Sequence, residues 1–176
     1  CWSFYSTHST GVRNDVLWFR EQPETSNIRH LAGGVHATAE PQATLGMGFD
    51  WVAIGEGELI IVELLRRLLH DEDVYTTPGL AYMRGNTFQH NPPPPLIQLD
   101  DCPPFADRWV RVNPIEITRG CIYACSFCQT PFMMKARFRH RSVSSVMHYV
   151  KIMKENGAWD IRFITPTSLS YGSEDG

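Results

Sequence analysis

The apolar positions in the first half of the chain form short runs, separated by a stretch with helical spacing. Segments over residues 1–7, 27–31 and 49–54 contain these apolar positions and have the length of strands. Between the first two runs, residues 11–22 carry apolar side chains at helical intervals. The pattern therefore predicts three short strands, with a helix between the first and the second.

A second helix is predicted after the third strand. Acidic residues precede it and basic residues lie near its end, as the helix dipole favours. Alternation of strands and helices predicts a parallel α/β sheet. The apolar face of this second helix consists of Ile60, Ile61, Leu64, Leu65 and Leu68.

The pattern changes after this helix. Residues 79–89 contain two short apolar stretches around a Gly-Asn turn and predict a β-hairpin. The segment from Asn91 to Phe105 contains six prolines, so it must be extended or irregular. We therefore divide the chain into an incomplete α/β domain over 1–75, a hairpin and Pro-rich linker over 76–112, and a second α/β unit over 113–176.

The second unit has the pattern of a strand, a loop, a helix and another strand. Residues 115–118 and 160–164 predict the strands, and a cysteine-containing loop over 119–131 follows the first of them. One such unit cannot bury both faces of a sheet. We therefore expect the sequence to be truncated at both ends, in agreement with its start at a cysteine in an apolar stretch.

The helix of the second unit has recognisable start and stop signals. Ser142 is suited to cap its N-terminus, and Gly157 to follow its C-terminus. Its predicted buried face consists of Val143, Val146, Met147, Val150 and Met153.

Composition and charge argue against several classes of protein. A net charge of -3 gives no basic surplus for nucleic acid or for an anionic membrane. The longest apolar run, residues 59–65, is far shorter than the roughly 20 residues that span a bilayer. Three of the five cysteines lie close together, which disfavours a secreted disulfide scaffold and favours a reducing, cytoplasmic location.

The clustered cysteines, Cys121, Cys125 and Cys128, have the spacing C-x3-C-x2-C. This spacing lets one short loop wrap three thiolates around a compact inorganic core, whereas iron–sulfur clusters usually have four cysteine ligands. Three ligands on a 4Fe–4S cluster would leave one iron open for a substrate or cofactor. A zinc site or a structural iron–sulfur site, without turnover, remains an alternative.

This loop resembles the signature of the radical S-adenosylmethionine (SAM) superfamily, which follows the first strand of a partial β/α barrel. The resemblance implies that the three cysteines bind a 4Fe–4S cluster, which cleaves SAM to a 5′-deoxyadenosyl radical. It places Phe127 at the adenine side of SAM, and Thr165 and Thr167 where the family has a glycine-rich SAM-binding stretch. It also implies an electron donor such as flavodoxin or ferredoxin and a substrate, small-molecule or other, that the sequence does not identify.

The first half of the chain resembles the cobalamin-binding-type domain that precedes the barrel in one radical SAM subgroup. The resemblance rests on segments after predicted strands, among them Gly33-Gly34-Val35-His36-Ala37-Thr38 and Gly55-Glu56-Gly57-Glu58. It implies a partial flavodoxin-like parallel sheet, followed by the first β/α units of the barrel. Glycines at strand ends let a ligand approach the backbone, and the candidate cobalamin-lining residues are Ser3, Gly33, Gly34, Gly55 and Gly57.

Plainer interpretations stand beside these. Such glycine turns are common in α/β domains without a cofactor, His36 is more typical of a loop histidine than of a cobalt ligand, and Glu56 and Glu58 suit a helix N-terminus. The basic stretch 135–141 is interpreted as a solvated face, with an anionic ligand as the alternative. A methylthiotransferase is a further alternative, although that family needs another cysteine trio that the chain does not supply.

Overall fold

The computed structural model describes residues 1–109 and 112–173 and divides into two compact units, Cys1–Leu96 and Ile97–Gly176. The division falls inside the Pro-rich segment. The sequence predicts three parts instead, over 1–75, 76–112 and 113–176. These domain boundaries remain a prediction. Each unit is described by itself.

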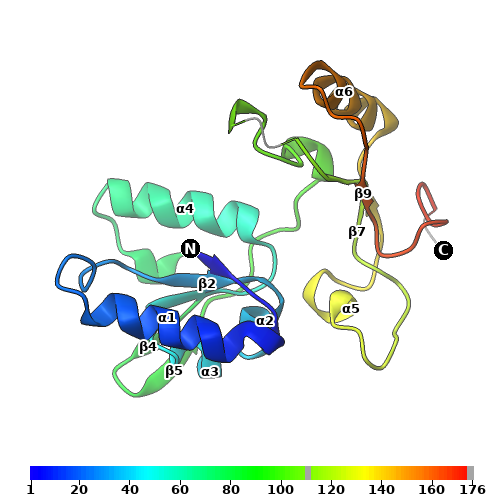
Figure 1. Cartoon of the computed structure of the whole chain (residues 1–176). Coiled ribbons are helices and arrows are strands. Elements are labelled where there is room, and N and C mark those ends of the chain that lie inside the picture. The colour runs from blue at the N-terminus through cyan, green and yellow to red at the C-terminus, as the bar shows by residue number, and fades with distance from the viewer. Residues whose placement is uncertain (110–111, 174–176) are drawn as a thin grey trace. The chain divides into compact units, whose positions relative to one another are not determined.

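The first unit contains one mixed sheet in which the strands are ordered as they occur in the chain (Figure 1). Its three N-terminal strands are parallel and its last two are antiparallel. The predicted hairpin is present and extends this sheet, because Ala81 pairs with Val52 and Leu80 with Ala53. The strands are β1 (Trp2–Ser3), β2 (Leu31–Gly33), β3 (Trp51–Ala53), β4 (Leu80–Arg84) and β5 (Thr87–His90).

Four α-helices cover the two faces of this sheet (Figure 1). The first three belong to one face, where Val16, Ala37 and Leu45 pack in a common core. The fourth covers the opposite face through Ile60 and Leu64. The helices are α1 (Ser9–Glu21), α2 (Gly34–Ala39), α3 (Pro41–Leu45) and α4 (Gly57–Leu69).

Alternation along the strands sorts residues between the two cores. Ala32 and Val52 face α1 to α3, whereas Leu31, Trp51 and Ala53 face α4. Successive side chains of a strand point to opposite faces, so a sheet covered on both sides needs apolar residues at every position. This requirement explains why β2 and β3 carry no polar side chain along their length.

The first predicted strand is wrong in its length. The sequence indicated a strand over 1–7, but β1 ends at Ser3 and a short 3-10 helix forms over Ser6–His8. The second is displaced, since residues 27–30 precede β2 rather than forming it. Residues 4–7 and 27–30 have no ladder partner among the described residues of the sheet. Further 3-10 turns lie at Val74–Thr76, Leu99–Asp101 and Asp107–Trp109.

The apolar face predicted for α4 is only partly buried. Ile60 and Leu64 are 1% and 2% exposed, whereas Leu65 and Leu68 are 49% and 42% exposed. A helix lying on a sheet contacts it along one narrow stripe. Leu65, one position beyond Leu64, lies off that stripe and remains at the surface of the unit, as does Leu68 near the end of the helix.

The second unit contains two short pairs of strands. β6 (Ile115–Glu116) is parallel to β9 (Phe163–Ile164), and α6 (Val143–Glu155) lies between them in the chain. β7 (Thr118–Arg119) is antiparallel to β8 (Arg139–His140). The remaining helix is α5 (Thr130–Met133), which lies between these two strands in the chain.

The predicted ends of α6 are confirmed. The Ser142 hydroxyl accepts a hydrogen bond from the Ser145 backbone N–H, at 3.1 Å, and Gly157 follows the helix with a φ of 77°. Asp100, from the Pro-rich segment, accepts a hydrogen bond from the Ser142 N–H at 2.9 Å. Hydrogen bonds from Ser142 lower the pKa of Asp100, so this carboxylate is held as an anion at a helix N-terminus.

The buried face predicted for α6 is confirmed only in part, and Val146 and Val150 are half-buried. Met153 is fully buried, but Val143 and Met147 are 65% and 59% exposed. The parallel pair that α6 connects along the chain has only two strands in the described residues, and Phe163 and Ile164 are themselves about half exposed. So small a sheet cannot cover a whole helix face.

A buried histidine joins the strands of the first unit to α1. The Trp2 indole N–H donates to His30 Nδ1 at 3.1 Å, and Asp50 accepts from the His30 backbone N–H at 2.7 Å. Arg20 pairs with the same carboxylate at 2.6 Å. Burial is the largest cause of a lowered pKa for His30, and the nearby Arg20 acts in the same direction.

We expect His30 to make the first unit sensitive to acid. Its pKa is lowered in the folded state, so its contribution is complete above the unfolded value of 6.5 and declines as the pH falls below it. Urea unfolding between pH 7.5 and 5 should show a falling free energy of unfolding, with a weaker pH dependence in His30→Gln. His70, which is exposed, supplies the control variant His70→Gln. An unchanged pH dependence in His30→Gln would contradict this assignment.

Candidate functional site

The three clustered cysteines lie on a loop that is closed at its base by β7 and β8. Thr118 pairs with His140 and Arg119 with Arg139, so residues 120–138 leave and return to one antiparallel ladder. The Arg119 guanidinium also pairs with Glu116, from β6, at 2.6 Å. The predicted strand over 115–118 is present as two short strands, β6 and β7, and the loop begins directly after β7.

The thiols of this loop differ in exposure. Cys121 is buried, Cys128 is half-buried and Cys125 is exposed, and all three are free. The Cys128 backbone N–H donates to the Cys125 carbonyl at 3.0 Å, which makes the second half of the motif a tight turn. Two accessible thiols and one buried thiol on a single turn-containing loop are a suitable donor set for a cluster with three thiolate ligands.

Thr130 tunes one of these thiols. Hydrogen bonds from its side chain and from its backbone to Cys128 lower the pKa of that thiol. The thiolate is the form that binds metal, so this local arrangement favours ligation. Among the residues that the structure describes, no three His, Cys, Asp or Glu side chains are grouped to hold a single metal ion.

The residues predicted to contact SAM lie on two segments that leave the same edge of the parallel pair. β6 and β9 are parallel, so the cysteine loop and the segment after Ile164 both follow carboxyl ends of strands. Thr165 Oγ1 donates to the Thr167 carbonyl at 2.8 Å and shapes that segment into a turn. Phe127 is 92% exposed on the cysteine loop. A role for these three residues in SAM binding stays a prediction.

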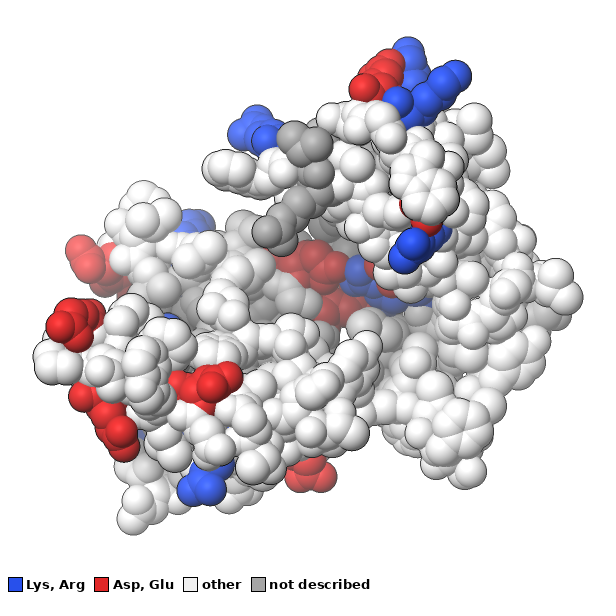
Figure 2. All heavy atoms as spheres, in the orientation of Figure 1, with Lys and Arg blue, Asp and Glu red and all other residues white. Residues whose placement is uncertain are grey.

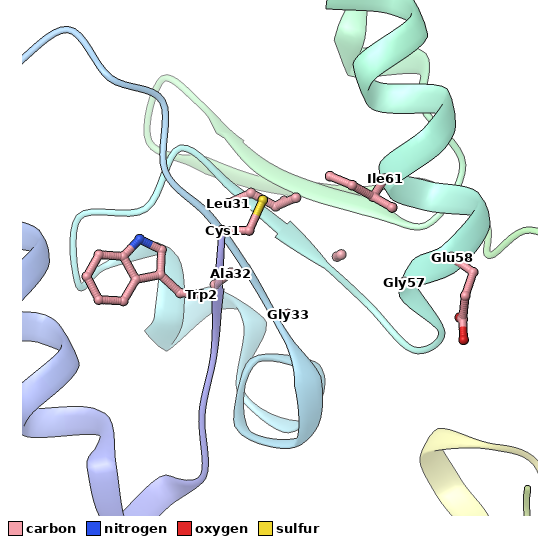
Figure 3. Close-up of a pocket in the computed structure, with 9 residues that line it drawn as sticks. Cys1, Trp2, Leu31, Ala32, Gly33, Gly57, Glu58 and Ile61 are labelled. Carbon is pink, nitrogen blue, oxygen red and sulfur yellow. The ribbon is translucent and has the colours of Figure 1, made fainter. Parts of the chain in front are cut away.

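The first unit has an apolar cavity of about 290 Å³ between its parallel strands and α4 (Figure 3). Figure 3 shows Leu31 and Ile61 pointing into it, whereas the indole of Trp2 points away. Glu58 is the charged residue in its lining. The lining residues are Cys1, Trp2, Leu31, Ala32, Gly33, Ala53, Gly57, Glu58 and Ile61.

The structure separates the five glycine and serine candidates into two groups. Gly33 and Gly57 line the cavity. The others lie near α2: a Cβ on Gly34 would approach Ser3 Oγ to 2.5 Å, and the Gly55 N–H donates to Thr38 Oγ1 at 3.0 Å. All five lie at or just beyond the carboxyl ends of β1, β2 and β3, where parallel sheets bind ligands. Their contact with cobalamin stays a prediction.

Sequence reasoning missed the apolar wall of this cavity. The sequence pattern assigns Leu31 and Ala53 to strands without a face, and places Ile61 on the apolar face of the second helix, whereas all three line the cavity. Strand alternation places Leu31 and Gly33 on one face, as it does Trp51 and Ala53. Strand alternation in the sequence could have identified the strand residues of this wall. It could not show that α4 leaves part of that sheet face uncovered.

The basic stretch divides in two. Lys135 and Arg137 are exposed, as a solvated face requires, but Arg139 and Arg141 are 6% and 2% exposed. Arg141 donates to the Glu116 carbonyl at 3.0 Å. The interpretation of the whole stretch as a solvated face is therefore wrong for two arginines, because strand alternation turns every second side chain inward.

His36 is engaged within the first unit. Its Nδ1 lies 2.9 Å from the Ser6 hydroxyl, and its ring lies 5.2 Å from that of Phe4. The structure places His36 on α2 and not on a loop, so its interpretation as a loop histidine is wrong in its placement.

On the face shown in Figure 2, acidic and basic side chains lie next to each other in places, and broad uncharged areas separate the charged groups. None of the helices in the described residues combines the length and apolar character that a membrane crossing requires.

Known proteins with similar sequences include a methyltransferase and a methylthiotransferase by name. The chain is 30% identical over 155 residues to the uncharacterized methyltransferase PH0819 of Pyrococcus horikoshii, covering 80% of this chain and 34% of that protein. It is 27% identical over 180 residues to the putative methylthiotransferase MJ0865 of Methanocaldococcus jannaschii, covering 96% and 38%. The chain thus spans about a third of the length of these relatives. No family model matches it.

Solved structures show the same fold. The radical SAM methyltransferase TsrM of Kitasatospora setae, solved with a tryptophan substrate and a SAM analogue, has a TM-score of 0.69 at 19% identity. That match covers 89% of this chain and 32% of TsrM. The cobalamin-dependent radical SAM enzyme OxsB, solved with aqua-cobalamin and SAM, has a TM-score of 0.74 at 16% identity, covering 92% and 24%.

These findings confirm the resemblance to radical SAM proteins that carry an N-terminal domain of the cobalamin-binding type. The fold is the predicted one: a partial, parallel-rich α/β sheet followed by the first β/α units of a barrel.

We expect Thr130→Val to raise the pKa of the Cys128 thiol, because one of its hydrogen-bond donors is lost. The iron-free, reduced protein should then alkylate more slowly at Cys128 near neutral pH, by a few-fold, as measured by mass spectrometry of iodoacetamide-treated samples. Cys125 in the same molecules is the internal control, and Thr130→Ser should retain the original rate. Equal alkylation of Cys128 in wild type and Thr130→Val would refute the effect.

Proposed function

We propose that this chain belongs to a radical SAM enzyme in which Cys121, Cys125 and Cys128 hold a 4Fe–4S cluster. When bound, that cluster supplies the electron that reductively cleaves SAM and yields a 5′-deoxyadenosyl radical. The observation that carries the proposal is the single closed loop that presents three free thiols at the carboxyl end of β6. The relatives are methyltransferases and methylthiotransferases by name, which supports methyl-group or methylthio-group chemistry.

The residues of this chain have separate tasks in the proposed reaction. Thr130 lowers the pKa of the Cys128 thiol, which favours its metal-binding thiolate form. Glu116 and Arg119 fix the direction in which the loop leaves the strand. The segment from Thr165 to Thr167 follows the adjacent strand, at the edge where parallel sheets bind ligands, and we assign it to SAM together with Phe127. No residue is assigned to proton transfer or to the substrate.

The cavity beside β2 is the proposed site for the apolar end of a cobalamin nucleotide tail. Its lining is almost wholly hydrocarbon, and Gly33 and Gly57 bring the backbone to its wall without side chains. Both properties suit a flat, apolar group held between a sheet and a helix. The structural relatives TsrM and OxsB were solved with cobalamin bound, which supports this assignment.

A methylthiotransferase is the second candidate, favoured by the similarity to MJ0865 along 96% of this chain. It would need a further cysteine trio, whereas this chain has only Cys1 and Cys102 outside the loop. A non-catalytic metal module is the third candidate and predicts zinc, or a cluster indifferent to SAM. The first two candidates would require an electron donor such as flavodoxin or ferredoxin. For both we propose a cytoplasmic location.

Anaerobic reconstitution with iron and sulfide, followed by EPR, tests the main proposal. We expect the reduced protein to show a 4Fe–4S signal that changes when SAM is added, because one iron lacks a protein ligand. The signal should be lost in Cys121→Ala and retained in Cys102→Ala, a cysteine outside the loop. Zinc uptake, or a cluster signal that SAM leaves unchanged, would favour the metal module and contradict the proposal.

We also expect Gly33→Leu to weaken cobalamin binding at least about tenfold, as measured by absorbance titration. A Cβ at residue 33 would have its nearest contact at 3.8 Å, so the longer side chain can enter the cavity without a backbone clash. Gly11→Leu is the matched control, since that position on α1 is exposed and has open space. Equal affinities of both variants and wild type would argue against this cavity as the cobalamin site.

A further inference from the structure

Arg139 occupies an unusual place for a residue of a basic stretch. Its side chain is 6% exposed, and its Nη1 donates to the Ile97 carbonyl at 2.9 Å in a fully buried hydrogen bond. Its Nη2 lies 3.4 Å from the carbonyl of Met134, at the end of α5. One guanidinium therefore joins the far limb of the cysteine loop to the first residue of the second unit.

The other end of the loop is fixed by backbone contact. Gly120, directly before Cys121, has a φ of +81°, and a Cβ there would lie 2.1 Å from the Arg137 carbonyl oxygen. It would also lie 3.3 Å from the Lys135 carbonyl oxygen. The two limbs of the loop thus meet where only a glycine fits, one residue beyond the ladder of β7 and β8.

We propose that Arg139 is a positioning residue that holds the cysteine loop in one closed conformation before any cluster is present. The inference rests on the proposed function in one respect, namely that the closed loop serves to bind a cluster. Ordering a flexible loop around a ligand costs conformational entropy at the moment of binding, and a loop ordered beforehand avoids that cost. Arg139 and Gly120 act on opposite limbs, so together they fix the span that carries the three thiols.

The chemistry of arginine suits this task. A guanidinium has several N–H donors in a fixed plane and keeps its charge at any pH that the protein survives, so it can hold two carbonyls at once. A lysine at this position would place a single ammonium on one of them. The alternative role for the basic stretch, binding of an anionic ligand, does not suit Arg139, because the side chain is buried and its Nη atoms face protein carbonyls.

The chain offers a matched control two residues away. Arg137 is exposed and Arg139 is buried, although both belong to the basic stretch 135–141. Loss of Arg137 removes the same charge from the same loop and leaves both carbonyl contacts of Arg139 in place. A difference between the two variants therefore reports the buried contacts and not the net charge.

Hydrogen–deuterium exchange of the whole iron-free chain, under reducing conditions, tests this proposal. The loop has hydrogen-bonded amides that serve as probes, those of Cys128, Phe132, Met133 and Met134. We expect Arg139→Met to raise their exchange rates about tenfold, the effect of losing one charge-assisted hydrogen bond. Arg139→Lys should have an intermediate effect, and Arg137→Met none.

Exchange elsewhere decides whether the effect is local. The amides of α6 and of the first unit should keep their wild-type rates in Arg139→Met. The proposal is overturned if the loop amides are unaffected, or if exchange rises equally in α6, since Arg139 would then support the whole unit. If Arg139→Met does not fold, Arg139→Lys and Gly120→Ala carry the same test, with the same two contrary outcomes.

The initial rate of cluster uptake in anaerobic reconstitution gives an independent readout. We expect Arg139→Met to load iron and sulfide several-fold more slowly than wild type and Arg137→Met. Equal loading rates would contradict the purpose assigned to the closed loop. If wild type itself takes up no cluster, the proposed function fails, whereas the exchange data still decide whether Arg139 closes the loop.

Discussion

Parallel pairing of short strands is the constraint on which both candidate sites depend. Parallel strands end at the same edge of a sheet, so the segments that follow β1, β2 and β3 meet at one edge of the first unit. The same pairing of β6 with β9 brings the cysteine loop and the segment after Ile164 to one edge of the second unit. The ladders are only two or three residues long, so helices and side-chain contacts must stabilise what the strands align.

Much of this arrangement could be predicted from the sequence. Long periodic segments gave α1, α4 and α6, and the chemistry of Ser142 and Gly157 gave the ends of α6. The spacing of Cys121, Cys125 and Cys128 indicated one loop, which the structure closes with β7 and β8. Such features are local, because each is determined by residues that lie close together in the sequence.

Features that depend on distant contacts could not be predicted. Residues 4–7 have the composition of a strand, yet the chain leaves the sheet after Ser3. Leu65 and Val143 lie at helix positions suited to a core, but the small sheets beneath them do not reach that far. Arg139 and Arg137 are the same residue type in one basic stretch, and the burial of Arg139 depends on distant contacts such as its hydrogen bond to Ile97.

The central claim is that three cysteines bind a 4Fe–4S cluster and leave one iron for SAM. Mössbauer spectroscopy of the protein loaded with the 57Fe isotope tests it most directly, because each iron contributes its own signal. The account predicts that one iron of the four changes its spectrum when SAM is added, while the three cysteine-bound irons do not. Four irons that stay equivalent with and without SAM would contradict it.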